Sequence, residues 1–111
     1  MAVIVVTWDN PMDLTKTKAA DAKAKNWRKT VLKQPGLVEY NAFTSLAVAG
    51  RGMAVDTFAT TADAGTFLVS GEFAKIVSEM TELGVTNIKT ELFTRHPDVP
   101  NALRPATLAH R

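Results

Sequence analysis

Residues 37–60 read LVEYNAFTSLAVAGRGMAVDTFAT, two runs of β-branched and aromatic residues around the glycine-bearing turn Gly50-Arg51-Gly52. Runs of this kind on both sides of a glycine turn are typical of a β-hairpin. We therefore predict one strand over 37–48 and its partner over 53–60. Side chains alternate between the two faces of a strand, and the more apolar face of the first run, expected to pack under helices, carries Val38, Tyr40, Ala42, Thr44, Leu46 and Val48.

Upstream of the hairpin, the chain predicts a strand and then a helix. Residues 2–8, AVIVVTW, are apolar and mostly β-branched, which is typical of a strand covered on both faces. Asn10 is a suitable N-cap and Pro11 a suitable first helical residue, with Thr15 as an alternative N-cap. Pro35-Gly36 then ends the helix. One apolar stripe at helical spacing is expected to face the sheet, formed by Ala20, Ala24, Trp27 and Val31.

Downstream of the hairpin, the sequence predicts a broken helix and a last strand. Thr60 or Thr61 can cap a short helical piece, and Ser70-Gly71-Glu72 marks a second start. Gly84 ends the helix, and residues 85–94, VTNIKTELFT, form the strand. The apolar residues at helical spacing in the second piece are Phe73, Ile76, Val77, Met80 and Leu83.

The order of these elements is β–α–β–β–α–β, which is the ferredoxin-like pattern of the α+β class. We expect a four-stranded antiparallel sheet with two helices on one face, formed by residues 1–94. Residues 95–111 contain three prolines, which favour an extended C-terminal tail rather than a helix or a central strand.

Composition limits the classes of function. The chain of 111 residues fits one domain. It has no cysteine, which excludes thiol chemistry and favours a cytoplasmic setting. The first residues have no basic segment of a signal peptide, and no apolar run is long enough to cross a membrane. Seven of the thirteen basic residues lie between Lys16 and Lys33, but the net charge is only +2, so we interpret this basic segment as a solvated helix face and expect no nucleic-acid partner.

The strands carry apolar residues on both faces, which predicts a partner for the sheet. Residues 2–6 do not alternate with polar residues, and the outer face of 37–48 includes Leu37, Phe43 and Ala47. An uncovered apolar face of this size usually marks a contact site. We therefore expect a homodimer that packs sheet to sheet. The alternative is a monomer in which the tail covers its own sheet.

Taken together, the element order, the Trp27…Pro35-Gly36-Leu37 segment, the long hairpin strand and the helix broken at Ser70 resemble the dimeric α+β barrel superfamily. The resemblance covers residues 2–94 and is greatest to the antibiotic-biosynthesis-monooxygenase-like branch. It implies, at most, a cofactor-independent oxygenase that acts on a small hydrophobic molecule. Haem-degrading members use a histidine at the position of Val77, and therefore we expect no haem chemistry and no cofactor.

Residues with usable chemistry are few. His96 could act as a base at a pocket rim or be an exposed tail residue, and His110 lies one residue from the end. Asp56 could be a buried general base, or could face solvent or pair with a cation. Asp9 allows the same choice, with a helix N-cap as the favoured interpretation. Two distant histidines predict no metal site.

The resemblance also implies where a pocket would lie, between the helices and the sheet, lined by Trp27, Tyr40, Phe67 and Met80. A second polar group, Glu39 and Asn41 with Asn87, Lys89 and Glu91, could form a paired network in the dimer interface or orient a ligand in a cavity. The sequence thus leaves two main hypotheses. One is a cofactor-free enzyme that acts on a small molecule, and the other is a non-catalytic dimeric binding or assembly module. Anion or nucleic-acid binding by the basic segment is a minor third.

Overall fold

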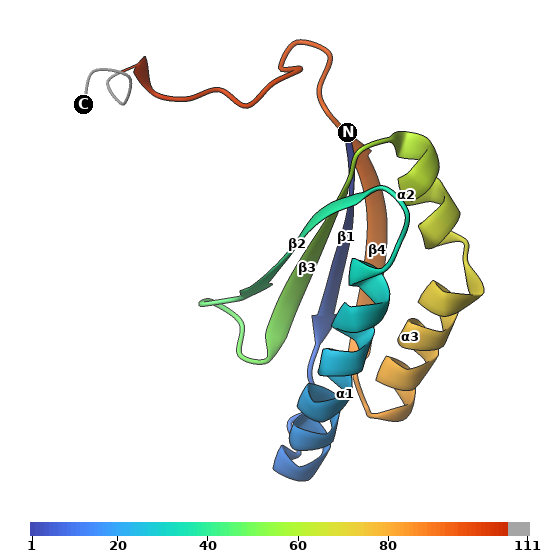
Figure 1. Cartoon of the computed structure of the whole chain (residues 1–111). Coiled ribbons are helices and arrows are strands. Elements are labelled where there is room, and N and C mark those ends of the chain that lie inside the picture. Colours follow the sequence, from blue (N-terminus) through green and yellow to red (C-terminus); the bar gives the residue numbers. More distant parts are fainter. Residues whose placement is uncertain (107–111) are drawn as a thin grey trace.

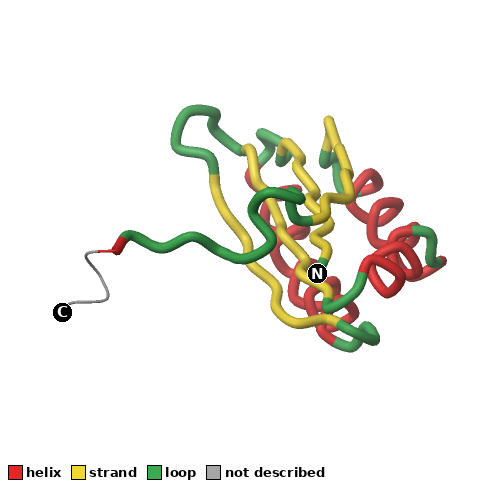
Figure 2. The backbone as a smooth tube through the Cα atoms, turned by 90° about the horizontal axis from the view of Figure 1, so that it is seen from above, coloured by secondary structure: helices red, strands yellow, loops and turns green. Residues whose placement is uncertain are grey.

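The computed structural model describes residues 1–106 and has the expected ferredoxin-like architecture (Figure 1). The sheet is antiparallel with the strand order β2-β3-β1-β4. Figures 1 and 2 place the helices on one side of this sheet and leave its other face open. The elements are β1 (Ala2–Asp9), α1 (Leu14–Leu32), β2 (Leu37–Thr44), β3 (Arg51–Phe58), α2 (Thr61–Leu68), α3 (Gly71–Glu82) and β4 (Thr86–Thr94).

Helix α1 begins later than predicted, and neither predicted N-cap is correct. The backbone N–H of Asn10 donates to the carbonyl of Gly50 at 2.8 Å, so Asn10 still belongs to the sheet edge. Asp13 is the N-cap instead, and its Oδ1 accepts a hydrogen bond from the backbone N–H of Lys16 at 3.1 Å. Thr15 lies inside the helix. A carboxylate at the N-cap also interacts favourably with the positive end of the helix.

The hairpin is present, but its strands are shifted from the predicted ranges. β2 ends at Thr44, four residues early, and β3 begins at Arg51. Between them Ser45 turns the chain, because its Oγ accepts from the backbone N–H groups of Ala47 and Val48 at 3.2 and 3.0 Å. Ser and Thr side chains that bond nearby backbone groups compete in this way with strand pairing.

A β-bulge at Val38 changes which residues of β2 face the helices. Leu37 pairs with Phe58, but Glu39 pairs with Thr57, so Val38 has no partner in the register. Tyr40, Ala42 and Thr44 lie on the helix-facing side, as predicted. Leu37 joins them there and packs on the core, and Val38 is 55% exposed, so the predicted faces of these two residues were exchanged.

The broken second helix is confirmed. Thr60 caps α2 and Ser70 caps α3, each side chain accepting from the backbone N–H three residues later. Gly84 follows α3 with φ +88°, a backbone conformation that glycine adopts without strain. The core between sheet and helices is centred on three fully buried side chains, Ile4, Phe58 and Phe67.

The described part of the tail leaves the sheet uncovered. It runs away from the domain in both views (Figures 1 and 2), and its residues from 95 to 106 are exposed except for half-buried Val99. The outer sheet face keeps exposed aromatic side chains, with Phe43 at 53% and Phe93 at 43%. The alternative of a self-covering tail is therefore wrong for these residues.

The domain boundary at residue 94 stays a prediction, and His110 lies outside the described residues. Within the described part of the chain, no helix has the length and apolar character required to span a membrane.

Candidate functional site

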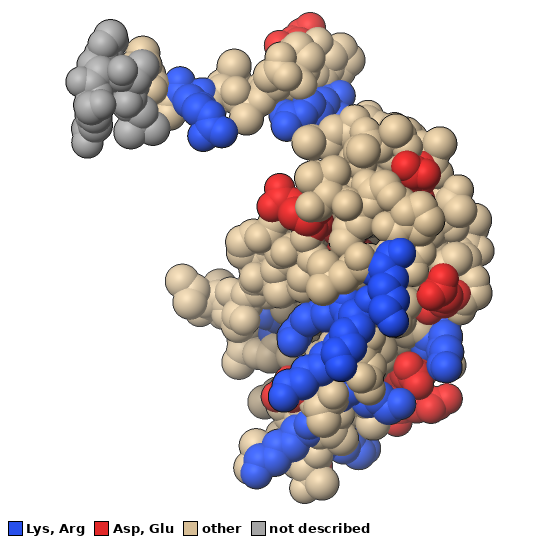
Figure 3. All heavy atoms as spheres, viewed as in Figure 1, with Lys and Arg blue, Asp and Glu red and all other residues tan. Residues whose placement is uncertain are grey.

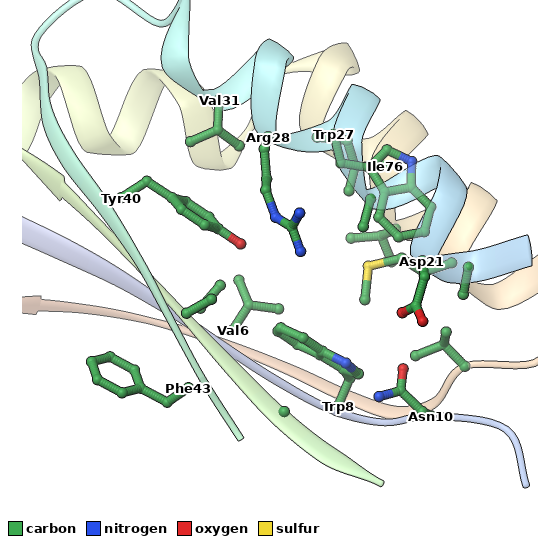
Figure 4. Close-up of a pocket in the computed structure, with 18 of the residues that line it drawn as sticks. Val6, Trp8, Asn10, Asp21, Trp27, Arg28, Val31, Tyr40, Phe43 and Ile76 are labelled. Atoms are coloured by element: carbon green, nitrogen blue, oxygen red, sulfur yellow. The ribbon is translucent and has the colours of Figure 1, made fainter. Parts of the chain in front are cut away.

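A cavity of about 250 Å³ lies between the inner face of the sheet and helices α1 and α3 (Figure 4). Its wall is mostly apolar, with a few polar groups that converge on the interior. Pockets that bind small molecules usually have this composition. The apolar and aromatic side chains of the wall include Val6, Trp8, Trp27, Val31, Ile76 and Met80.

Asp56 is the buried carboxyl group of this cavity. It lies on β3 between Ala54 and Phe58, two other helix-facing residues of the strand, and its register partners are Ile4 and Tyr40. The residue is 2% exposed, and no group of residues 1–106 makes a hydrogen bond to its Oδ1. Burial raises the pKa of Asp56 to about 6, because the ionised carboxylate loses hydration. A group with this pKa can accept a proton near neutral pH.

Trp8 forms the floor of the cavity because Gly52 leaves room for it. The two residues are cross-strand partners, and a Cβ atom on Gly52 would lie 2.6 Å from Cζ2 of the indole. Any side chain at this position would push the indole toward the cavity. Gly52 thus sets the depth of the cavity at this end.

Trp27 is fixed by a hydrogen bond outside the cavity. Its Nε1 donates to Oε1 of Glu79 at 3.1 Å, and Oε2 of the same carboxylate accepts from Nζ of Lys23 at 3.1 Å. The hydrogen bond from Trp27, and then the one from Lys23, lower the pKa of Glu79. The indole therefore has its polar partner, and its ring is held between α1 and α3 as an apolar wall.

Two cationic side chains line the cavity, and they differ in their partners. Arg51 donates to both carboxylate oxygens of Asp9, at 2.8 and 3.2 Å. Asn87 donates to the same carboxylate at 3.2 Å. These bonds, first the one from Arg51, lower the pKa of Asp9 and make it a poor base. Asp9 ends β1 and is not the helix N-cap, so that interpretation is wrong. The second cation, Arg28, points into the cavity (Figure 4).

The structure brings four of the candidate residues together and separates two. Trp27, Tyr40, Met80 and Asp56 all line the cavity. Phe67 lies outside it, packed in the core with ring centroids 6.0 Å from Phe58 and 5.3 Å from Phe73. His96 also lies outside the lining set, exposed on the tail, where its Nδ1 accepts from the backbone N–H of Asp98. Whether the lining residues bind a ligand stays a prediction.

Sequence reasoning missed Trp8 and Arg28, although each position carried a signal. Trp8 continues the alternation of Ala2, Ile4 and Val6, which all face the helices. Arg28 lies four residues after Ala24 and so shares its helix face. In the sequence it stands among the basic residues of the segment 16–33. Asn10, Asp21 and Thr44 are further polar residues of the lining.

The remaining polar groups lie away from the cavity. Glu39 and Asn41 share the outer face of the sheet, where Nδ2 of Asn41 donates to Oε2 of Glu39 at 3.1 Å. Lys89 and Glu91 are on the same outer face, opposite Thr7 and Val5. None of them lines the cavity under the helices, but Glu39 lines a second hollow with Thr57 and Phe93, so a ligand-orienting role for these groups stays a prediction.

The basic segment and the acidic groups suggest no second site. Figure 3 shows the lysine and arginine side chains spread across the exposed surface of α1, with acidic groups beside them. Within residues 1–106, no three histidine, cysteine, aspartate or glutamate residues lie close enough to hold a metal ion.

Comparison with known proteins gives the fold. No family model and no curated protein matches the chain. A candidate antibiotic biosynthesis monooxygenase from Deinococcus radiodurans superposes with a TM-score of 0.71 at 13% identity, over 95% of this chain and 98% of that one. SnoaB, a cofactor-independent oxygenase from Streptomyces nogalater, superposes with a TM-score of 0.64 at 12% sequence identity, over 90% of this chain and 97% of that one. A conserved protein of unknown function from Bacteroides thetaiotaomicron superposes with a TM-score of 0.65 at 23% sequence identity, over 83% of this chain and 94% of that one.

These identities are low enough that the likeness establishes the fold alone. The superpositions cover nearly the whole length of each compared chain, so the match is to a complete domain. The resemblance seen in the sequence is thereby confirmed at the level of the fold, because the chain shares its ferredoxin-like fold with the candidate antibiotic biosynthesis monooxygenase and with SnoaB.

Proposed function

We propose that the cavity binds a small, planar, mostly apolar molecule and that the protein catalyses its oxygenation by O₂ without a bound cofactor. The observation that carries the proposal is Asp56, a buried carboxyl group with no hydrogen-bond partner at Oδ1 among the described residues, in an apolar cavity. Leaving such a group unpaired costs free energy, and unpaired buried groups often have a functional role. The shared fold with SnoaB supports the same reaction class.

Asp56 has the properties of a general base for a carbon acid. A CH₂ group beside a carbonyl or aryl group could lose a proton to this carboxylate and leave a delocalised carbanion. Burial makes the carboxylate a stronger base than an exposed one, since its pKa is raised to about 6. The apolar wall would exclude water from the carbanion.

The proposed reaction balances without an external reductant. CH₂ and O₂ give C=O and H₂O. One oxygen atom enters the carbonyl group, and the other leaves as water with the two hydrogens, including the proton first held by Asp56. All four electrons that O₂ accepts come from the carbon that is oxidised.

Oxygen uptake with anthrone, a planar ketone with an acidic CH₂ group, tests this proposal. We expect the wild type to form the quinone with one atom of ¹⁸O from ¹⁸O₂, and Asp56→Asn to lower kcat/KM by about 100-fold or more, the usual contribution of a general base. The matched control is Asp98→Asn on the exposed tail. Lack of oxygen uptake by the wild type would contradict the oxygenase, and an unchanged Asp56→Asn rate would contradict the role of Asp56.

We propose in addition that two copies associate through the outer face of the sheet. This face has an apolar centre with a polar border that includes the Glu39–Asn41 pair. A hydrophobic centre with a polar rim is the usual anatomy of a protein interface. The apolar residues of the face are Val3, Val5, Phe43, Met53, Val55 and Phe93. If the cavity proves to bind nothing, this face supports a non-catalytic dimeric assembly module.

A further inference from the structure

Arg28 is the cation of the cavity that has no carboxylate partner among residues 1–106. The other cation of the lining, Arg51, is held by Asp9. A long charged side chain on a helix surface usually extends its head into water. Arg28 is also exposed to solvent, but its side chain is directed from α1 toward the sheet, into the space between the Tyr40 hydroxyl and the Trp8 indole (Figure 4).

The groups around the guanidinium favour a single negative charge on a flat molecule. The Tyr40 hydroxyl turns toward the guanidinium from the opposite wall and can donate a second hydrogen bond (Figure 4). Trp8, Val6 and Val31 supply apolar surface next to it. A planar guanidinium pairs with a carboxylate through two parallel hydrogen bonds. One guanidinium and one hydroxyl are few donors for a phosphate, and they match a carboxylate.

The carboxyl group of Asp56 does not neutralise Arg28. The two ion pairs of residues 1–106 join Lys23 to Glu79 and Arg51 to Asp9, and neither includes Arg28 or Asp56. Asp21, the other acidic residue of the lining, lies away from the Arg28 head group (Figure 4). Arg28 and Asp56 therefore both line the cavity without forming an ion pair with each other.

We propose that the ligand of this cavity is an aromatic carboxylate, with its anionic group on Arg28 and its ring against Trp8 and the apolar wall. This inference rests on the proposed function, because it assumes that the cavity binds a small molecule. It names the ligand class and assigns Arg28 as its recognition residue.

Calorimetric binding of three probes of nearly equal shape tests whether the cavity prefers a negatively charged ligand. The probes are 2-naphthoate, 2-naphthalenemethanol and 2-naphthylmethylammonium, each with the full-length protein at constant pH and low salt. We expect 2-naphthoate to bind about tenfold more tightly than the alcohol, the usual gain from a charge-assisted hydrogen bond. The ammonium probe should bind more weakly than the alcohol.

Variants of α1 then test whether Arg28 is the residue that recognises the carboxylate of the ligand. Arg28→Gln should remove the preference for 2-naphthoate and leave the binding of the alcohol unchanged, and Arg28→Lys should restore part of the preference. The matched control is Lys29→Gln, which removes the same charge from the next, exposed residue and should bind like the wild type.

The outcomes separate the two proposals. Equal affinity for the acid and the alcohol, tighter binding of the ammonium probe, or a preference that survives Arg28→Gln would overturn the carboxylate inference and leave the cavity as a binding site. Binding of none of the three probes would overturn the binding site itself and the proposed function with it. Binding that follows the expected order in a protein that takes up no oxygen would uphold the inference and contradict only the oxygenase.

Discussion

At the scale of single residues, Asp56 links stability to pH. Its pKa is about 6 in the folded protein against an ordinary value of 3.8, so between these pH values the folded state holds a proton that the unfolded state releases. For an acid with a raised pKa, stability is highest below about pH 4, falls as the pH rises to about 6, and stays constant above that. A shift of this size corresponds to about 3 kcal/mol.

Asp56→Asn removes the ionisable group, and its effect should therefore depend on pH. We expect the free energy of unfolding of the variant, relative to wild type, to increase by about 2 to 3 kcal/mol between pH 4 and pH 8. Urea unfolding at a series of pH values measures this. A difference that stays constant with pH would show that Asp56 titrates normally in the folded protein.

The same titration predicts the pH dependence of catalysis. If Asp56 is the base, kcat/KM for anthrone should rise with pH and level off above a midpoint near 6, because only the carboxylate accepts a proton. A rate that is independent of pH between 4.5 and 8 would contradict this assignment.

At the scale of elements, Ser70 holds the break between α2 and α3. Its Oγ donates to the carbonyl of Phe67 at 2.7 Å and accepts from the backbone N–H of Phe73 at 3.1 Å. Both rings belong to the aromatic cluster of the core. One hydroxyl thus ends one helix and starts the next, and it fixes where the two phenylalanines meet.

Loss of this hydroxyl should cost stability. We expect Ser70→Ala to lower the free energy of unfolding by about 1 to 2 kcal/mol, as for other N-cap serines. Ser78→Ala, an exposed change in the middle of α3, should alter it by less than about 0.5 kcal/mol. Urea denaturation of both variants at one pH provides the comparison, and equal values would contradict the capping role of Ser70.

At the scale of the whole molecule, the open outer face of the sheet is the feature to test. Phe93 lies on this face and is 43% exposed, and Val69 is an apolar, 83% exposed residue at the end of α2. We expect Phe93→Lys to convert a dimer to monomers at micromolar concentration, because it would bury an unpaired charge in the interface. Val69→Lys adds the same charge and should leave the dimer intact. Sedimentation velocity distinguishes these results, and a monomeric wild type would refute the dimer.

The sequence by itself determined the order of the elements and the positions of the helical break and the glycine stops. These features depend on residues close together in the chain. Ser70 and Gly84, for example, act on backbone groups within a few residues, and the stripe of Trp27 and Val31 follows from helical spacing. The same local logic placed Trp27 and Tyr40 on faces directed at the core.

Only the tertiary structure decided the rest. The bulge at Val38 depends on the register with β3, and the late start of α1 on the bond between Asn10 and Gly50, forty residues away. The cavity could not be predicted from the sequence, because it also depends on contacts between residues that are far apart in the chain. Trp8, Arg28, Tyr40 and Asp56 come from four different elements, and nothing in their local sequence shows that strand pairing and helix packing bring them around one cavity. Local chemistry fixed the elements, and contacts between distant residues fixed the site.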